Sequence, residues 1–312
     1  MILKSKLKKL IVSYCHGENR TLVGKIIDDK LEYFINNDKP INFIMPAFPG
    51  KSPNSNSTFT SDIGLEEIIA LKTIENFISS INCLYQYGCK FTIIHDGHLF
   101  YDLGITRTDE QLTSYVKSFI KLKSDSIISF TLNDLMGSNS FSVSRNKFKK
   151  EYVESNINCP CSRDIQNETL FTKNEFADKI GYLNMSKNQL QKKSKEIAKK
   201  ALILKAGLSD LISKNFDRYI RLSIHYQKKE SPKMGIQLIP NAINHGTPWF
   251  NVLYKAPSGK VILGKKDWDI PSKQLINENE QGYLYEISES DLKSFEEGRF
   301  TSRIYYSNKL NR

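Results

Sequence analysis

Short apolar runs alternate with helical segments in the first half of this 312-residue chain, and this order limits the fold more than any other feature of the sequence. The runs 42–45, 91–95 and 127–130 are bounded by loop residues, as buried strands are. Segments 65–84 and 111–122 carry apolar residues at helical spacing. Strands that alternate with helices predict a Rossmann-like, mostly parallel α/β sheet with flanking helices.

The rest of the chain changes character. The middle is polar and predicts helices around 145–156, 173–179 and 187–206, the last with a strongly basic surface. The C-terminal part is β-rich. We expect a single domain over residues 1–312, with a possible domain boundary near residue 210. The strands expected there are 219–226, 235–239, 249–254, 260–263 and 282–287.

Composition narrows the class of protein only a little. The formal charge of +11 and the pI near 9.2 fit a nucleic-acid ligand or a phosphorylated substrate. They fit equally a set of solvated lysine-rich helices, which is the more common origin of such charge. The five cysteines have no zinc-site spacing, and no apolar run approaches the roughly 18 residues of a membrane helix. We expect a cytoplasmic protein.

The loop that follows the first strand reads Pro-Ala-Phe-Pro-Gly-Lys-Ser-Pro-Asn over residues 46–54. Its prolines and glycine exclude regular structure. Lys51, Ser52 and Asn54 offer an ammonium, a hydroxyl and an amide to a phosphate or carboxylate. The glycine spacing of a nucleotide-binding P-loop is missing. A proline-fixed structural turn with an exposed lysine is the alternative.

A second polar group follows the strand at 91–95. Asp96 and His98 are two residues apart and can act as acid and base, with Asp102 nearby as a substrate-binding carboxylate. The alternative is an Asx turn at Asp96 with His98 in a surface contact. Parallel strands present their carboxyl ends at one edge of the sheet, where ligands bind. The sequence therefore places the two polar loops at the same edge.

The third group lies in the C-terminal part. Arg221, Ser223 and His225 share one face of a predicted strand, as a ligand wall or as a solvated face. Thr247 and Trp249 precede the next strand, where the indole either lines a substrate pocket or packs in the core. The chain has no serine nucleophile elbow, dinucleotide turn or zinc-protease helix. We expect chemistry on an anionic substrate without a cofactor and without a metal.

Several of these motifs, in this order, resemble the pyoverdine/dityrosine biosynthesis family, which contains the isocyanide (isonitrile) synthases. The matching segments cover most of the chain between residues 30 and 265. They are PAFPGKSPN at 46–54, HDGHLFYDLG at 95–104, TDEQLTSY at 108–115, RLSIH at 221–225 and TPWF at 247–250.

The resemblance implies an enzyme of secondary-metabolite biosynthesis that joins an aromatic L-amino acid to ribulose 5-phosphate. Tyrosine is the favoured amino acid and tryptophan the alternative. The amine nitrogen is kept, carbon 2 of the sugar becomes the isocyanide carbon, and carbon–carbon bonds beside it break in a lyase reaction without a redox cofactor. These small molecules are the expected partners, with a downstream oxygenase in the same pathway and with neither nucleic acid nor membrane.

The resemblance also assigns roles to the candidate residues. Lys51 and Ser52, helped by Arg221, would hold the phosphate, while Asp96 with His98 or His225 would transfer protons. Asn54, Asp102, Ser223, Thr247 and Trp249 complete the expected substrate-binding set. The family usually has histidine where Phe250 stands. That departure leaves open an altered family member that binds these substrates without turnover.

Overall fold

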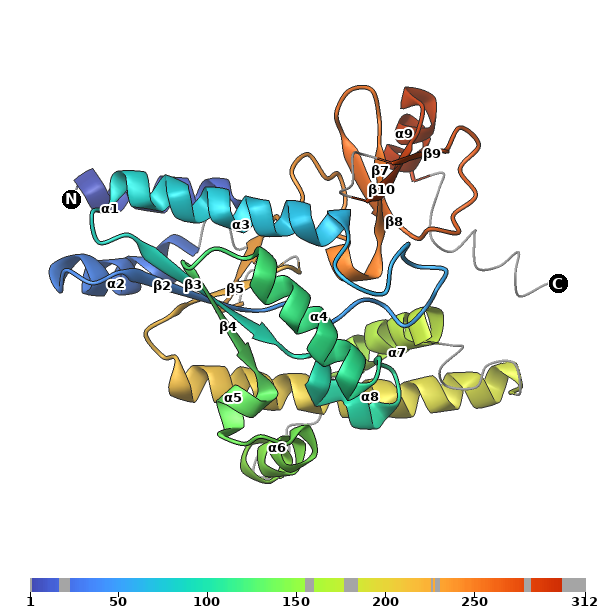
Figure 1. Ribbon diagram of the computed structural model, residues 1–312, viewed down its shortest axis with the longest axis horizontal. Coiled ribbons are helices and arrows are strands. Elements are labelled where there is room, and N and C mark those ends of the chain that lie inside the picture. Colours follow the sequence, from blue (N-terminus) through green and yellow to red (C-terminus); the bar gives the residue numbers. More distant parts are fainter. Residues whose placement is uncertain are drawn as a thin grey trace.

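A computed structural model describes residues 2–16, 23–154, 160–176, 185–225, 227, 231–277 and 282–298 (Figure 1). Its centre is a six-stranded sheet in which only the edge strand β1 runs antiparallel to its neighbour. The expected Rossmann-like, mostly parallel sheet is therefore confirmed. Its strands, in spatial order, are β1 (Cys15–His16), β6 (Met234–Ile236), β5 (Ile220–Ser223), β2 (Ile41–Pro46), β3 (Cys89–His95) and β4 (Ile127–Thr131).

Helices cover both faces of this sheet, and Figure 1 shows α1 and α3 on one side and α5, α6 and α8 on the other. One apolar cluster joins the sheet to α1, α2, α3 and α4, and a second joins it to α5, α6 and α8. Burial on both faces explains why the runs at 42–45 and 91–95 are almost wholly apolar. The helix bounds are Ile2–Ser13 (α1), Val23–Asn36 (α2), Leu65–Leu84 (α3), Asp109–Leu122 (α4), Leu132–Met136 (α5), Phe141–Phe148 (α6), Ser162–Phe176 (α7), Lys187–Asn215 (α8) and Glu289–Glu296 (α9).

The order of the strands reverses between β2 and β5. From β2 the chain moves outward through β3 to β4, and then it returns across the sheet through α8 to place β5 on the other side of β2. In open α/β sheets the crevice at such a reversal, beyond the carboxyl ends of the strands, is where ligands bind. The loop at 46–54 leaves β2 at this point, and the segment ending at His225 leaves β5 beside it.

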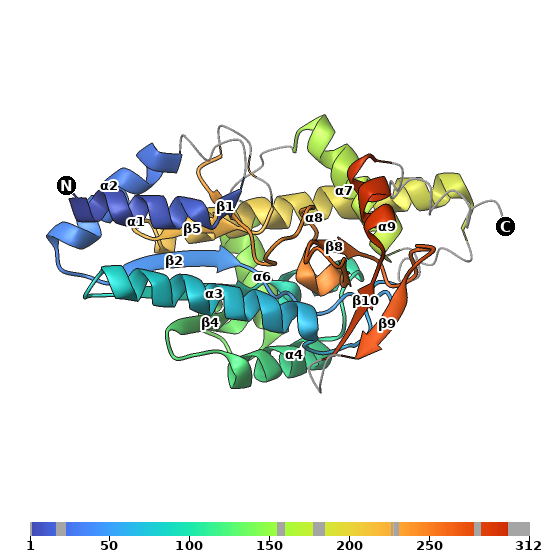
Figure 2. The same cartoon turned by 90° about the horizontal axis from the view of Figure 1, so that it is seen from above.

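A second, four-stranded sheet lies beyond the carboxyl ends of the large sheet (Figures 1 and 2). The helix α9 and an apolar cluster around Trp268 and Tyr254 cover one of its faces. Its strands, in spatial order, are β8 (Val261–Gly264), β7 (Val252–Lys255), β10 (Tyr283–Glu286) and β9 (Gln274–Asn277).

Several predicted elements differ from those observed. Pro248–Phe250 forms a turn of 3-10 helix (η5) rather than the start of a strand. The helix expected at 173–179 begins much earlier, at Ser162, and residues 177–179 lie outside the described part. Residue 210 lies inside α8, and the following strands β5 and β6 return to the large sheet.

Two shorter helical segments, η2 (Gly97–Leu103) and η3 (Lys149–Val153), complete the fold. None of the helices in the described ranges is long and apolar enough to cross a membrane.

Candidate active site

A cavity of about 530 Å³ opens where the strand order reverses. Its walls come from the end of β2, the loop at 46–54, the turn after β3, the segment after β5, and the helices α7 and α8. A volume of this size suits a small organic ligand. The lining combines charged side chains of both signs with aromatic rings, and the charged members are Lys51, Asp96, Arg107, Asp164, Glu168 and Lys205.

Two glycines let the motif loops approach each other at the cavity floor. A Cβ atom at Gly97 would lie 1.7 Å from the carbonyl oxygen of Pro49, and one at Gly50 would lie 2.4 Å from a methyl carbon of Leu112. Gly50 also has a φ of +111°, which side chains rarely adopt. The sequences PAFPG and HDG therefore fit together as one unit, and only glycine leaves room for the contact.

Lys51 lines the cavity, but its ammonium is turned into the protein. It lies 3.1 Å from a carboxylate oxygen of Glu66 and 2.5 Å from one of Glu67, and the lysine side chain is only 1% exposed. Burial raises the pKa of Glu67 to about 7, against the opposing effect of Lys51. Burial also lowers the pKa of Lys51, but the two carboxylates outweigh it and leave that pKa raised. Lys51 is thus a charged partner of α3, and the geometry does not offer it to a phosphate.

The next two polar residues of the loop also face the protein. The hydroxyl of Ser52 donates to a carboxylate oxygen of Glu175 on α7. Asn54 makes an Asx turn in which its side-chain oxygen accepts from the backbone N–H of Asn56 at 2.9 Å. Neither residue lines the cavity. Their polar atoms hold the loop in shape, and their role in substrate binding stays a prediction.

Arg107 supplies a positive charge to the same wall of the cavity. Its Nε donates to the carbonyl of Lys51 at 3.1 Å, and its Nη2 donates to the carbonyl of Ser52 at 2.7 Å. Burial lowers its pKa. These bonds fix the guanidinium against the loop while its side chain still contributes to the lining.

Asp96 and His225 both line the cavity, one at the end of β3 and the other after β5. Burial raises the pKa of Asp96 to about 6, although the nearby charge of Lys205 opposes the shift. Solvent reaches the imidazole of His225 through the cavity, yet enough protein surrounds it that burial lowers its pKa to about 4. The charges of Lys205 and Lys233 add to that lowering. Near neutral pH the site therefore holds a neutral imidazole and a carboxyl group that exchanges its proton readily.

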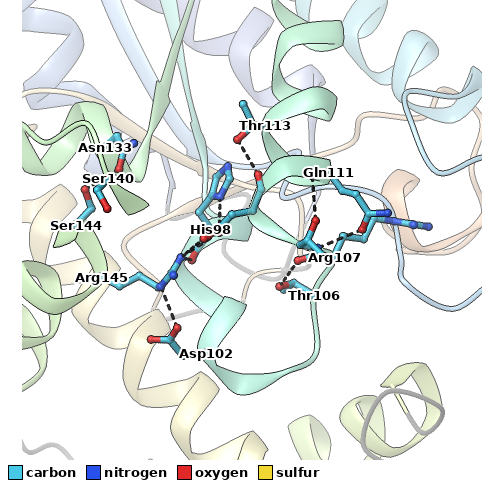
Figure 3. A network of polar contacts seen from close by, with 12 residues as sticks. His98, Asp102, Thr106, Arg107, Gln111, Thr113, Asn133, Ser140, Ser144 and Arg145 are labelled. Carbon is cyan, nitrogen blue, oxygen red and sulfur yellow. Dashed lines mark hydrogen bonds and ion pairs between the residues drawn. The ribbon is translucent and has the colours of Figure 1, made fainter. Parts of the chain in front are cut away.

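His98 lies outside the cavity lining, in a network of polar contacts behind it (Figure 3). Its Nδ1 lies 2.9 Å from Asp109, and its ring stacks on Phe141 with the ring centres 3.5 Å apart. Asp109 in turn accepts from Arg145, with both carboxylate oxygens 3.0 Å from Nη1. The ring anchors η2 to α4 and α6, and the proton-transfer role of His98 stays a prediction.

Asp102 belongs to the same network on the outer side of η2 (Figure 3). Its carboxylate lies 3.0 Å from Nε of Arg145 and 2.6 Å from the ammonium of Lys149, and it is 37% exposed. It does not line the cavity. Its partners are the cations of Arg145 and Lys149, and its role in substrate binding stays a prediction.

The polar face of β5 packs against α8 rather than opening to the cavity. Arg221 donates to the hydroxyls of Ser209 at 2.9 Å and of Ser213 at 2.8 Å. The hydroxyl of Ser223 accepts from the backbone N–H of His225 at 3.2 Å. Of the three residues predicted on this strand face, only His225 lines the cavity. Arg221 therefore does not line the cavity, and its side chain is held against α8.

The apolar wall of the cavity is aromatic. Trp249 lines it with only 3% of its surface exposed, and it packs against Phe48 at 5.2 Å between ring centres. Phe250 lines it too and meets Phe171 of α7 edge to face at 5.6 Å. Thr247 completes this side, and its carbonyl accepts from the side chain of Asn251 at 2.8 Å. Trp249 thus serves the core and the cavity at once.

Sequence reasoning missed several lining residues. Arg107, Glu168, Phe171 and Lys205 come from segments in which no motif marks them. Lys205 lies in the basic stretch of α8, where a solvated face is the ordinary interpretation. Ala201, four residues earlier, lines the cavity, and Ser209, four residues later, bonds Arg221. Residues four apart share a helix face, so this spacing would have placed Lys205 on the inner face of α8.

Comparison with known proteins agrees with this geometry. The family model described as "Pyoverdine/dityrosine biosynthesis protein" matches residues 31–181 and 166–273, which together span most of the chain.

The chain belongs to the pyoverdine/dityrosine biosynthesis family.

Curated relatives from this family include isonitrile synthases. The L-tryptophan isonitrile synthase AmbI2 of Fischerella ambigua is 32% identical over 233 residues, covering 72% of this chain and 70% of the relative. The L-tyrosine isonitrile synthase of Xenorhabdus nematophila is 29% identical, covering 81% of this chain and 78% of the relative.

The crystal structure of the PvcA protein of Pseudomonas aeruginosa shares the fold with a TM-score of 0.79 and 23% identity. The superposition covers 91% of this chain and 99% of that one.

Proposed function

We propose that this protein is an isonitrile synthase that converts the amine of an aromatic L-amino acid, tyrosine or tryptophan, to an isocyanide with ribulose 5-phosphate as the carbon source. Its relatives in the family include synthases named for each of the two amino acids. The observation that carries the proposal is one cavity at the strand reversal that joins Asp96 and His225 to an aromatic wall and to basic side chains.

The chemistry calls for proton transfer at this point. The amine of the amino acid condenses with the ketone of the sugar and water leaves. Carbon–carbon bonds on either side of the former ketone carbon must then break, and the rest of the sugar leaves as fragments with phosphate released. Both steps need groups that take up and return protons near neutral pH. Asp96, with its pKa at about 6, meets that requirement at the end of β3, and the neutral imidazole of His225 can hydrogen-bond the reacting atoms from the end of β5.

The aromatic wall supports an aromatic amino acid as the substrate. Trp249, Phe250 and Phe171 offer ring faces and edges on one side of the cavity. Aromatic pairs contribute about 0.5–1.5 kcal/mol beyond the area that they bury. Phe250 makes ring contacts in the position where the family usually has histidine, so it contributes shape rather than an acid or base.

Isotope transfer tests the proposal directly. The purified protein is incubated with tyrosine or tryptophan and with ribulose 5-phosphate carrying ¹³C at carbon 2, and the products are analysed by mass spectrometry. We expect a labelled isocyanide of at least one of the two amino acids. The Asp96→Asn variant should lose turnover, while the matched Asp102→Asn variant, altered at a surface ion pair, should keep it.

Binding of both substrates without any isocyanide would support the alternative of a family member without turnover. Absence of both binding and product would refute the proposal.

A further inference from the structure

The cations that line the cavity are not equally available to an anionic ligand. Lys51 is neutralised by two carboxylates, and the guanidinium of Arg107 is bound to two loop carbonyls. Lys205 has one carboxylate partner, Glu168 of α7, with its ammonium 2.7 Å from the nearer oxygen, and the lysine side chain is 45% exposed. Of the lysine and arginine side chains described in the lining, Lys205 is the exposed one, so a ligand can reach its ammonium beside Glu168.

Positive charge gathers behind Lys205. The register of β5 against β6 pairs Leu222 with Met234, so Arg221 and Lys233 are neighbours just before that pair. Arg221 is held by Ser209, one helical turn after Lys205 on the same face of α8. Burial, together with the charges of Arg221 and Lys205, lowers the pKa of Lys233 to about 8. The three cations therefore act on one small region next to the cavity.

Among the described residues, the acidic side chains that act on Lys205 are Glu168, which pairs with it, and Asp96, which lies close enough to feel its charge. Asp96, with its pKa at about 6, is mostly ionised at neutral pH, whereas the pKa of His225 at about 4 leaves its imidazole uncharged. A dianion is the ligand that gains most from Lys205, Lys233 and Arg221 acting together.

We propose that the end of β5 beside Lys205, with Lys233 and Arg221 behind it, is the subsite for the phosphate group of the sugar phosphate. It rests on the proposed function for the identity of the sugar, but the phosphate chemistry follows from the charges themselves. This assignment moves the phosphate from the loop at 46–54 to the end of β5, where Lys205 is close enough for its charge to act on Asp96 and His225.

Direct binding of inorganic phosphate tests the subsite without any need for turnover. Isothermal titration calorimetry of the full chain with inorganic phosphate should show binding that weakens by roughly tenfold or more in Lys205→Met, the loss of one charge-assisted contact. Binding should also weaken in Lys233→Met, which removes a charge behind the cavity wall. Lys200→Met is the matched control, because Lys200 lies on the same helix and pairs with Glu196 at the surface. It should bind phosphate as the unaltered protein does.

A second arm separates phosphate from the other anion that could bind here, the carboxylate of the amino acid. Titration with tyrosine or tryptophan alone should give affinities that change less than threefold in Lys233→Met. A loss of amino-acid binding with unchanged phosphate binding would overturn the proposal. Two independent lysine variants keep the test decisive if one of them does not fold.

The outcomes also distinguish the subsite from the proposed function. Phosphate binding that depends on Lys205 and Lys233, without isocyanide production, would uphold the subsite and remove the function. Isocyanide production with an unchanged KM for ribulose 5-phosphate in both variants would uphold the function and remove the subsite.

Discussion

Replacing Lys51 by methionine removes the cation that two buried carboxylates share. The lysine ammonium contacts Glu66 and Glu67, and the carboxylate side chains are only 4% and 1% exposed. Glu67 also accepts from the backbone N–H of Gly64 at the start of α3 and from the hydroxyl of Tyr115. Methionine has a similar length and no charge, so the substitution isolates the loss of the ion pairs from a loss of volume.

The expected cost is about 4 kcal/mol at pH 7. Removing one member of a buried ion pair costs about 3–5 kcal/mol, because the remaining charge is left without a partner. Protonation limits that cost. The carboxyl groups of Glu66 and Glu67 together bind one more proton in the variant than in the unaltered protein, which removes the unpaired charge. A glutamate titrates near 4.3 in the unfolded chain, and each pH unit above that value costs about 1.36 kcal/mol for a carboxyl that must stay neutral, which gives about 4 kcal/mol at pH 7.

The pH dependence identifies the mechanism. A carboxyl whose folded pKa is raised binds more protons in the folded state, so stability falls as the pH rises above its unfolded value. The difference between Lys51→Met and the unaltered protein should therefore shrink from about 4 kcal/mol at pH 7 to about 1 kcal/mol at pH 5. Urea unfolding followed by circular dichroism at several pH values measures it.

A triple variant provides the control. Lys51→Met combined with Glu66→Gln and Glu67→Gln removes every charge of the cluster, so most of the lost stability should return. Unchanged stability of Lys51→Met at pH 7, together with loss of phosphate binding, would refute this reasoning. It would show that the ammonium serves a ligand rather than the two carboxylates of α3.

Three further outcomes follow from the site. The kcat/KM should fall as the pH falls through about 6, where Asp96 becomes protonated, and Asp96→Asn should lower it by about 10²–10⁴ above that pH. Gly97→Ala should cost at least about 2 kcal/mol and remove activity, because its Cβ meets the carbonyl of Pro49. Gly104→Asn should keep activity, because nothing lies within 4 Å of a Cβ there and asparagine tolerates its φ of +68°. His98→Gln should lower the melting temperature without changing the calorimetric affinity for phosphate, since the ring anchors η2 behind the cavity.

The helix α3, which follows the loop at 46–54, shows where local sequence is sufficient to predict structure. α3 spans Leu65–Leu84 as its apolar spacing predicts, and Thr108 caps α4 through a bond from the N–H of Gln111. Such elements depend on contacts between residues a few positions apart. Chain order then leads to a parallel sheet, because strands that alternate with helices have few other ways to bury both faces.

The direction in which each polar side chain points depends on partners far along the chain. Ser52 bonds Glu175, which is 123 residues away, and Arg145 binds Asp109 across 36 residues. These partners turned Ser52 away from the cavity that the sequence assigned to it. No local pattern carries this information, because a hydroxyl or ammonium is equally able to bind a substrate or a buried carboxylate.

The sequence by itself determined the parallel α/β sheet, the edge at which its loops gather, and the motifs that mark the family. Tertiary structure alone decided which members of those motifs face the cavity. It kept Asp96 and His225, turned the ammonium of Lys51 toward α3, and brought in Lys205 from a helix that looked like a solvated surface. The physical reason is that charge is neutralised or left available only when distant strands and helices come together.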